Sequence, residues 1–161
     1  MTGDRYRPQV LVLPEDGANR QLANGFKLHH SVEQRSILVL PEAGGWSKVR
    51  DLFAKVHAAE MASNPRRYMV LLVDFDGKAS RLDEIRVAIP DHLAERVFVI
   101  GIWTVPEDLY RHGLPSKEHF GFALANECSE NRREFWNHPL LKHNAEELDR
   151  MAVTLKPVLF P

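Results

Sequence analysis

Two aspartates separated by one phenylalanine, Asp74 and Asp76, stand at the end of an apolar, β-prone run over residues 69–73. Such a run predicts a buried strand, which would carry both carboxylates to the carboxyl edge of a sheet, where parallel α/β proteins place their sites. Two anionic groups held close together repel each other unless a cation or a shared proton relieves the repulsion. Hard oxygen ligands suit Mg²⁺ or Mn²⁺, so the pair predicts a divalent cation.

A second polar group, Glu15 with Asp16 and Asn19, comes directly after the first apolar run of the chain. If the two strands are neighbours, these residues lie beside Asp74, and the converging carboxylates would hold one or two Mg²⁺ ions. Glu15 would also be placed to act as a general acid or base. The alternative is structural: a turn follows the strand, and Asp16 or Asn19 caps the next helix.

A glycine pair, Gly44 and Gly45, follows the second apolar run and stands at the mouth of a predicted helix. Glycines there allow close backbone approach, and the free amides of a helix start favour an anion such as phosphate. Lys48 would assist in holding the anion, and Trp46 would stack on a base. The alternative is a tight turn with a core tryptophan. The loop lacks the spacing of a P-loop, so hydrolysis of ATP or GTP is disfavoured.

Further charged residues follow the later runs. Lys78 and Arg81 come just after the aspartates and would neutralise a transition-state phosphate, with solvated surface charge as the alternative. Glu107 follows the fourth run as a second-tier acidic candidate, although acids are also favoured at an ordinary helix start. Cys128 has no activating base next to it in the sequence, which predicts a buried structural thiol.

The apolar runs recur with helix-sized spacers between them, over residues 10–13, 36–40, 69–73 and 96–102. Buried strands alternating with crossover segments predict a parallel sheet with helices on its faces. Amphipathic spacing predicts helices over residues 20–30, over 46–61, and from 79 to just before 90. The expected fold is a Rossmann-like α/β domain over residues 1–110, with a mostly parallel four-stranded sheet flanked by helices.

The remainder of the chain, residues 111–161, predicts a helical extension packed on the same domain. Helices are expected over residues 119–136 and 144–155. Asn144 and Glu147, three residues apart, predict an amino-terminal cap with reciprocal side-chain bonding.

Composition sets the class of protein. The chain has 161 residues, 44% apolar and 27% charged, as in a soluble globular protein with one core. A formal charge of −1 gives no general attraction to polyanions, so any contact with nucleic acid must come from a local basic surface or from a partner. A single cysteine, the absence of zinc-site spacing, and the absence of a signal peptide or membrane-spanning run predict a cytoplasmic location without membrane contact.

The order of these motifs resembles the Toprim domain, especially the version in overcoming-lysogenization-defect nucleases and small Toprim-like proteins. The matching residues are Glu15 after the first strand, Gly44-Gly45 after the second and Asp74-x-Asp76 after the third, within about the first 110 residues. The resemblance implies a Mg²⁺-binding fold used in topoisomerases, primases and nucleases. It also implies that Glu15 acts as acid/base or metal ligand and that Asp74 and Asp76 are metal ligands.

The chain departs from that family in having Asp16 before Gly17, and Asn19 where an aspartate is usual. An amide in place of a carboxylate lowers the charge of the site and would weaken or remove a second metal.

Three functional hypotheses follow. The first is a Mg²⁺-dependent, nuclease-like protein that cleaves phosphodiester bonds in DNA or RNA. The second is a non-catalytic Toprim-like module that binds a metal or nucleotide and works through a protein partner, or as a homodimer, by its C-terminal helices. The third is a phosphatase of the haloacid-dehalogenase type, because residues 73–77 resemble the nucleophile loop of that family.

Overall fold

The computed structural model describes residues 7–112 and 114–161, and its centre is a four-stranded sheet in which every neighbouring pair is parallel. The strands are β1 (Gln9–Pro14), β2 (Ile37–Val39), β3 (Arg67–Leu72) and β4 (Val97–Ile100). Their spatial order is β2-β1-β3-β4, so the order of the strands reverses between β1 and β3. The α/β class and the parallel four-stranded sheet predicted from the apolar runs are confirmed.

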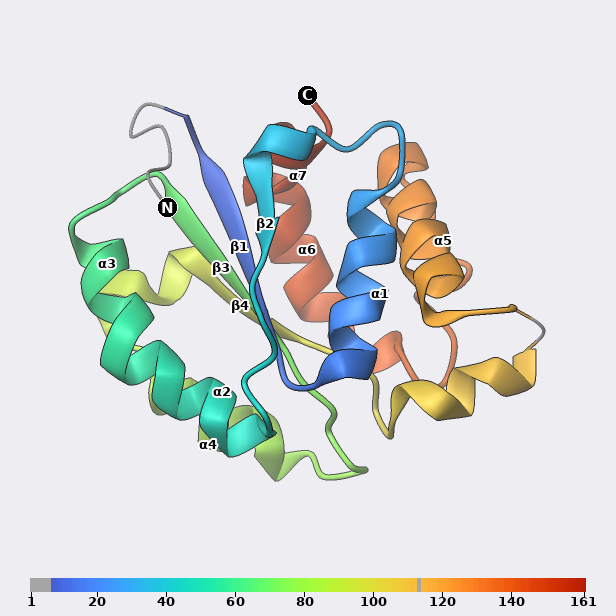
Figure 1. Ribbon diagram of the computed structural model, residues 1–161, viewed down its shortest axis with the longest axis horizontal. Helices are drawn as coiled ribbons and strands as arrows, with labels where there is room; N and C mark the ends of the chain where they lie inside the picture. Colours follow the sequence, from blue (N-terminus) through green and yellow to red (C-terminus); the bar gives the residue numbers. More distant parts are fainter. Residues whose placement is uncertain (1–6, 113) are drawn as a thin grey trace.

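Helices cover both faces of the sheet (Figure 1). One layer holds α1 (Gly17–Lys27), α5 (Lys117–Glu130), α6 (Ala145–Thr154) and α7 (Lys156–Leu159). The other holds α2 (Trp46–Leu52), the π-helical turn η2 (Phe53–His57), α3 (Ala58–Ala62) and α4 (Ser80–Arg86). Short 3₁₀ turns connect these elements: η1 (Gln34–Ser36), η3 (Asp91–Arg96), η4 (Pro106–His112) and η5 (Lys142–Asn144). None of the helices in the described ranges has the length and apolar character needed to cross a membrane.

The strands divide their side chains between two hydrophobic cores, because successive residues of a strand point to opposite faces. Val10 and Val12 of β1 belong to the core shared with α1, α5, α6 and α7. Leu11 and Leu13 belong to the core shared with α2, η2, α3 and α4. Both faces of β1 are therefore buried, which explains why its sequence is apolar throughout.

Helices α1 and α5 approach each other closely at two glycines, one in each helix. A Cβ atom placed on Gly121 would lie 1.9 Å from the carbonyl oxygen of Leu22. A Cβ atom on Gly25 would lie 2.0 Å from the carbonyl oxygen of Glu118. Only residues without a Cβ allow two backbones to come this close.

The helix predicted over residues 119–136 is shorter than expected. Helix α5 ends where Asn131 adopts a left-handed conformation, with φ of 57°, a common way of ending a helix. The chain then turns back toward α5, and the Glu127 carboxylate accepts the backbone N–H groups of Phe135 and Trp136 at 2.9 and 3.1 Å. The tertiary contact with Glu127 thus replaces the last predicted helical turns.

The predicted reciprocal cap between Asn144 and Glu147 is wrong, because both side chains bind the outer edge of β4 instead. Glu147 Oε2 accepts the Val99 N–H at 2.8 Å. Asn144 Oδ1 accepts the Gly101 N–H at 3.1 Å, and its Nδ2 donates to the Gly101 carbonyl at 2.9 Å. An edge strand leaves a row of backbone groups unpaired, and these two side chains satisfy part of that row.

Replacing Asn144 with alanine is therefore expected to lower the free energy of unfolding by about 2 kcal/mol, since the buried N–H and C=O of Gly101 lose their partner. Urea unfolding followed by circular dichroism measures this. The matched control is Asn137→Ala at an exposed position. Equal stabilities of the two variants would contradict the role of Asn144 as an edge cover.

Candidate functional site

The polar residues that follow β1 and β3 meet where the strand order reverses. β1 and β3 are neighbours, and the strands that follow them lie on opposite sides of this pair. In open α/β sheets, ligands bind outside the carboxyl ends of the strands at such a reversal. Glu15 directly follows β1, and Asp74 follows β3 after one residue, so both stand at this position.

Glu15 joins the loops that follow the first three strands. Its Oε2 accepts the Asp74 N–H at 2.6 Å, which ties the first loop to the third. Its backbone carbonyl accepts the N–H groups of Gly44 and Gly45 at 2.8 and 3.1 Å. The prediction that the glycine pair offers free amides to a phosphate is wrong for these two residues, because both amides already donate to Glu15. Their positive φ angles, 99° and 143°, explain why glycines stand there.

Asn19 connects the first loop with the third through its side-chain amide. Its Nδ2 donates to Asp16 Oδ1 at 2.9 Å and to Asp74 Oδ1 at 3.0 Å. The same Asp16 oxygen accepts the Asn19 backbone N–H at 2.9 Å and caps α1, which therefore begins earlier than the sequence predicts. The Asn19 side chain is fully buried, and its Oδ1 has no hydrogen-bond partner within the described residues.

The electrostatics of the carboxylate cluster, formed by Glu15, Asp16, Asn19, Asp74 and Asp76, disfavour the charged carboxylates. Burial is the largest effect and raises the pKa of Asp74 to about 7; the hydrogen bond from Asn19 lowers this pKa, and the nearby Glu15, Asp16 and Asp76 carboxylates raise it. Burial likewise raises the pKa of Glu15, against the lowering effect of the hydrogen bond from Asp74 N–H. The two side chains are only 5% and 8% exposed. A positive charge bound here would relieve the repulsion.

Asp76 lies beside these residues but pairs with a cation of the protein itself. Arg81 Nη1 donates to Asp76 Oδ2 at 2.7 Å and to the Asp74 carbonyl at 2.9 Å. The Arg81 side chain is buried, and its guanidinium stacks over the Trp46 ring at 4.5 Å from the centroid. Arg50 lies over the same ring at 5.2 Å. Trp46 is half-buried, so it serves as a platform for two arginines in this structure.

The remaining predicted residues are Lys48, Lys78 and Glu107. Lys48 and Lys78 are exposed, and Lys48 packs against Gly44, where a Cβ would lie 3.4 Å from its side chain. Glu107 is exposed in η4 and lies 3.8 Å from Lys117. The structure therefore brings together Glu15, Asp16, Asn19, Asp74 and Asp76 and leaves Glu107 with a structural ion pair.

One neighbour of the site, His143, is missed by the sequence analysis. Its ring packs against Phe75, the residue between the two aspartates, with centroids 4.8 Å apart, and against Trp103 at 5.3 Å. Burial lowers the pKa of His143, so the ring is neutral at physiological pH and packs as an apolar group. No local sequence pattern predicts this contact, because His143 lies far from Phe75 along the chain.

The side chains of the carboxylate cluster are not arranged as a complete metal site. Within residues 7–112 and 114–161, no three His, Cys, Asp or Glu side chains are grouped so that they could hold a metal ion together. The Asn19 amide stands between two of the carboxylates, and Arg81 binds a third. The chain matches no protein-family model, and comparisons with curated proteins and with solved structures likewise find no match.

Proposed function

We propose that the carboxylate cluster after β1 and β3 binds Mg²⁺ and that the protein is a Toprim-like, metal-dependent phosphodiesterase acting on nucleic acid. The observation that carries the proposal is the pair of buried carboxylates, Glu15 and Asp74, held within one hydrogen-bonded cluster at the reversal of strand order. Buried charges of like sign are costly unless a cation compensates them. The carboxylates of the cluster present oxygen atoms, the ligands that Mg²⁺ prefers.

A second observation also fits a cation: the buried Oδ1 of Asn19 has no hydrogen-bond partner among the residues that the structure describes. Rotation of this amide would present Oδ1 in place of Nδ2 to an ion held by Asp16 and Asp74. A Mg²⁺ ion there would supply Lewis-acid stabilisation of a phosphoryl oxygen. The raised pKa of Glu15 lets its carboxyl group hold or release a proton closer to neutral pH, as a general acid or base requires. Exposed Lys48 and Lys78 would bind the phosphates of a substrate electrostatically.

The test combines metal binding with cleavage by the purified chain. Mn²⁺ binding is measured by electron paramagnetic resonance with Mg²⁺ competition, and fluorescent single- and double-stranded DNA and RNA serve as substrates. We expect cleavage in Mg²⁺ or Mn²⁺ that EDTA stops. Replacing Glu15 with glutamine should slow cleavage roughly 100-fold or more, since an acid/base group is lost. The exposed control Glu95→Gln should retain it. Metal-independent cleavage would contradict the proposal.

A non-catalytic module that works through a partner is the second candidate, and one observation favours it. The Asn19 Nδ2 group donates to two carboxylates at once. These hydrogen bonds stabilise negative charge that a bound cation would otherwise compensate. A site stabilised in this way would bind metal or nucleotide without turnover. Saturable Mn²⁺ binding with no cleavage of any of the four substrates would support this candidate over the first.

The phosphatase hypothesis has less support, because the Asp74 carboxyl group is buried and already accepts a hydrogen bond. A nucleophilic aspartate must reach its substrate. Trapping of a phosphoaspartate mimic with beryllofluoride, seen as a mass increase at Asp74, would nevertheless establish this chemistry.

A further inference from the structure

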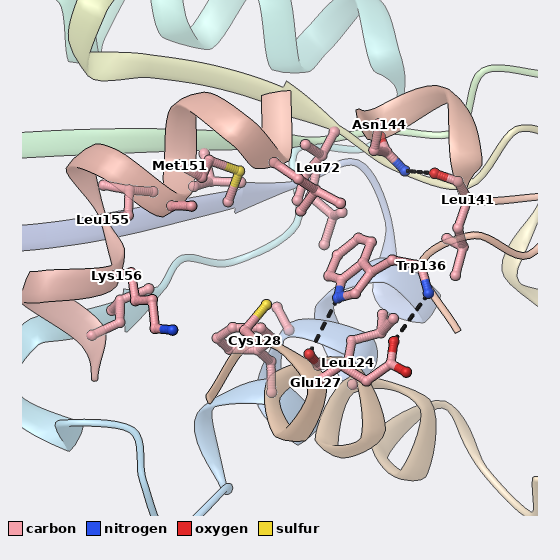
Figure 2. A pocket seen from close by; sticks show the side chains of 18 of the residues that line it. Leu72, Leu124, Glu127, Cys128, Trp136, Leu141, Asn144, Met151, Leu155 and Lys156 are labelled. Carbon is pink, nitrogen blue, oxygen red and sulfur yellow. Dashed lines mark hydrogen bonds between the residues drawn. The ribbon is translucent and has the colours of Figure 1, made fainter. Parts of the chain in front are cut away.

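A cavity of about 240 Å³ lies between the sheet and the helices of the α1 layer. Its walls include Val12 of β1, Leu72 of β3, Leu124 of α5 and Leu155 at the end of α6 (Figure 2). All four side chains are buried. Protein interiors contain few voids larger than a water molecule, because an empty apolar space forfeits dispersion contacts and costs stability. A cavity of this size and character therefore suits an apolar occupant.

The cavity opens at one end, where its lining includes exposed residues. The exposed residues Asn131 and Ala152 belong to its lining, whereas the residues against the sheet are buried. Lys156, at the junction of α6 and α7, stands at this mouth, and Figure 2 shows its amine directed toward Cys128. The opening thus lies between the C-terminal end of α5 and the α6–α7 junction.

The charges at the mouth select the kind of ligand. Lys156 Nζ donates to the Asn131 side-chain oxygen, a neutral acceptor, so this bond leaves the ammonium charge uncompensated. The two arginines beside the cavity are each paired with a carboxylate: Arg132 with Glu130 at 2.8 Å and Arg133 with Asp149 at 2.7 Å. Lys156 and Arg133 both act electrostatically on the Cys128 thiol, although burial dominates and raises the pKa of Cys128 to about 11. An anionic group at the mouth would therefore find Lys156 as its counter-ion.

We propose that this cavity binds a single-chain alkyl carboxylate, a medium-chain fatty acid, with its tail among the leucines and its carboxylate at Lys156. An apolar cavity of about 150 Å³ accommodates benzene, and by that ratio the present volume corresponds to roughly ten carbon atoms. None of Glu15, Asn19 and Asp74 lines the cavity, so the binding site is separate from the carboxylate cluster. The inference does not depend on the proposed function.

Cys128 provides a direct readout, because it is the single cysteine of the chain and lines the cavity. Decanoate below its micelle concentration is the probe, with calorimetry for binding and the rate of thiol reaction with a disulfide reagent for occupancy. We expect one molecule of decanoate per chain and a slower reaction of Cys128. Decanol, with an uncharged head group, and butyrate, with a short tail, should each bind at least roughly tenfold more weakly.

Three variants test the role of the Lys156 charge and that of the cavity volume separately. Lys156→Gln should weaken decanoate binding roughly tenfold and leave decanol binding unchanged, whereas Lys142→Gln, at an exposed position outside the cavity lining, should alter neither. Met151→Trp should fill the cavity and abolish binding, with its fold verified by circular dichroism. Absence of saturable binding by the wild type would overturn the proposal. Equal binding by the filled variant, or equal binding of decanoate and decanol, would overturn it as well.

Discussion

Replacing Asp74 with asparagine is expected to weaken Mn²⁺ binding at least roughly 100-fold and at the same time to make the metal-free protein more stable at pH 8. The first effect follows from the loss of a charged oxygen ligand. The second follows from the environment of Asp74, whose carboxyl group is buried beside the carboxylates of Glu15, Asp16 and Asp76. A residue that stabilises the fold would show the opposite change in stability.

The direction with pH follows from the raised pKa. Asp74 has a pKa of about 7 in the folded chain, against an ordinary value of 3.8 in the unfolded chain. Between these values the folded state binds more protons than the unfolded state, so the free energy of unfolding falls as the pH rises. The loss of stability caused by the charged Asp74 carboxylate is fully present above pH 7 and absent below about pH 4. Its size is about 4 kcal/mol, and Asp74→Asn, which stays neutral, should escape it.

Urea unfolding of wild type and variant between pH 4.5 and 8 measures the difference, with Asp91→Asn at an exposed position as the matched control. The gap between wild type and Asp74→Asn should widen with pH, and saturating Mn²⁺ should close it by stabilising only the wild type. Asn19→Asp provides the complementary change: it adds a carboxylate, so it should bind Mn²⁺ roughly tenfold more tightly and destabilise the metal-free protein at pH 8. A stability gap that does not change with pH would contradict the assignment of the penalty to Asp74.

Replacing Gly121 with alanine is expected to destabilise the protein by about 3 kcal/mol or more. In an ordinary helix interior this substitution stabilises by about 1 kcal/mol, because alanine is the better helix former. Here the added Cβ would lie 1.9 Å from the Leu22 carbonyl oxygen and 2.7 Å from the Phe26 amide nitrogen. Both atoms belong to the backbone of α1, so the two helices would have to separate and lose buried contacts.

The matched control is Gly17→Ala, at the start of α1, where nothing lies within 4 Å of the added Cβ. That variant should unfold at the same urea concentration as the wild type or slightly higher. Thermal and urea unfolding of both variants give the comparison. A stabilising effect of Gly121→Ala would show that α1 and α5 are not held at the distance described.

The strands illustrate what the sequence alone predicts. The run over residues 69–73 is apolar because β3 is buried on both faces of the sheet. The position of the acidic residues after β1 and β3 is predicted in the same way, since the carboxyl ends of parallel strands lie at one edge of the sheet. What the sequence could not specify is which strands are neighbours, and this decides whether Glu15 meets Asp74.

The partners of the site residues were decided by the tertiary structure. Arg81 follows the aspartates closely in the sequence, and the folded chain, in which Asp76 has a φ of 50°, places the Arg81 guanidinium against Asp76 and over Trp46. Asn144 and Glu147 have the spacing of a helix cap, but both side chains accept backbone N–H groups at the open edge of the sheet instead. The reason is that buried backbone groups must have hydrogen-bond partners.

The sequence by itself determined the α/β alternation, the parallel sheet and the acidic character of its carboxyl edge, because these depend on local periodicity and on residue type. The tertiary structure decided the strand order, the Asn19 bridge between two carboxylates and the cavity beside α5, α6 and α7. These features join residues far apart along the chain. Their energies depend on distances and burial that exist only once the helices have packed on the sheet.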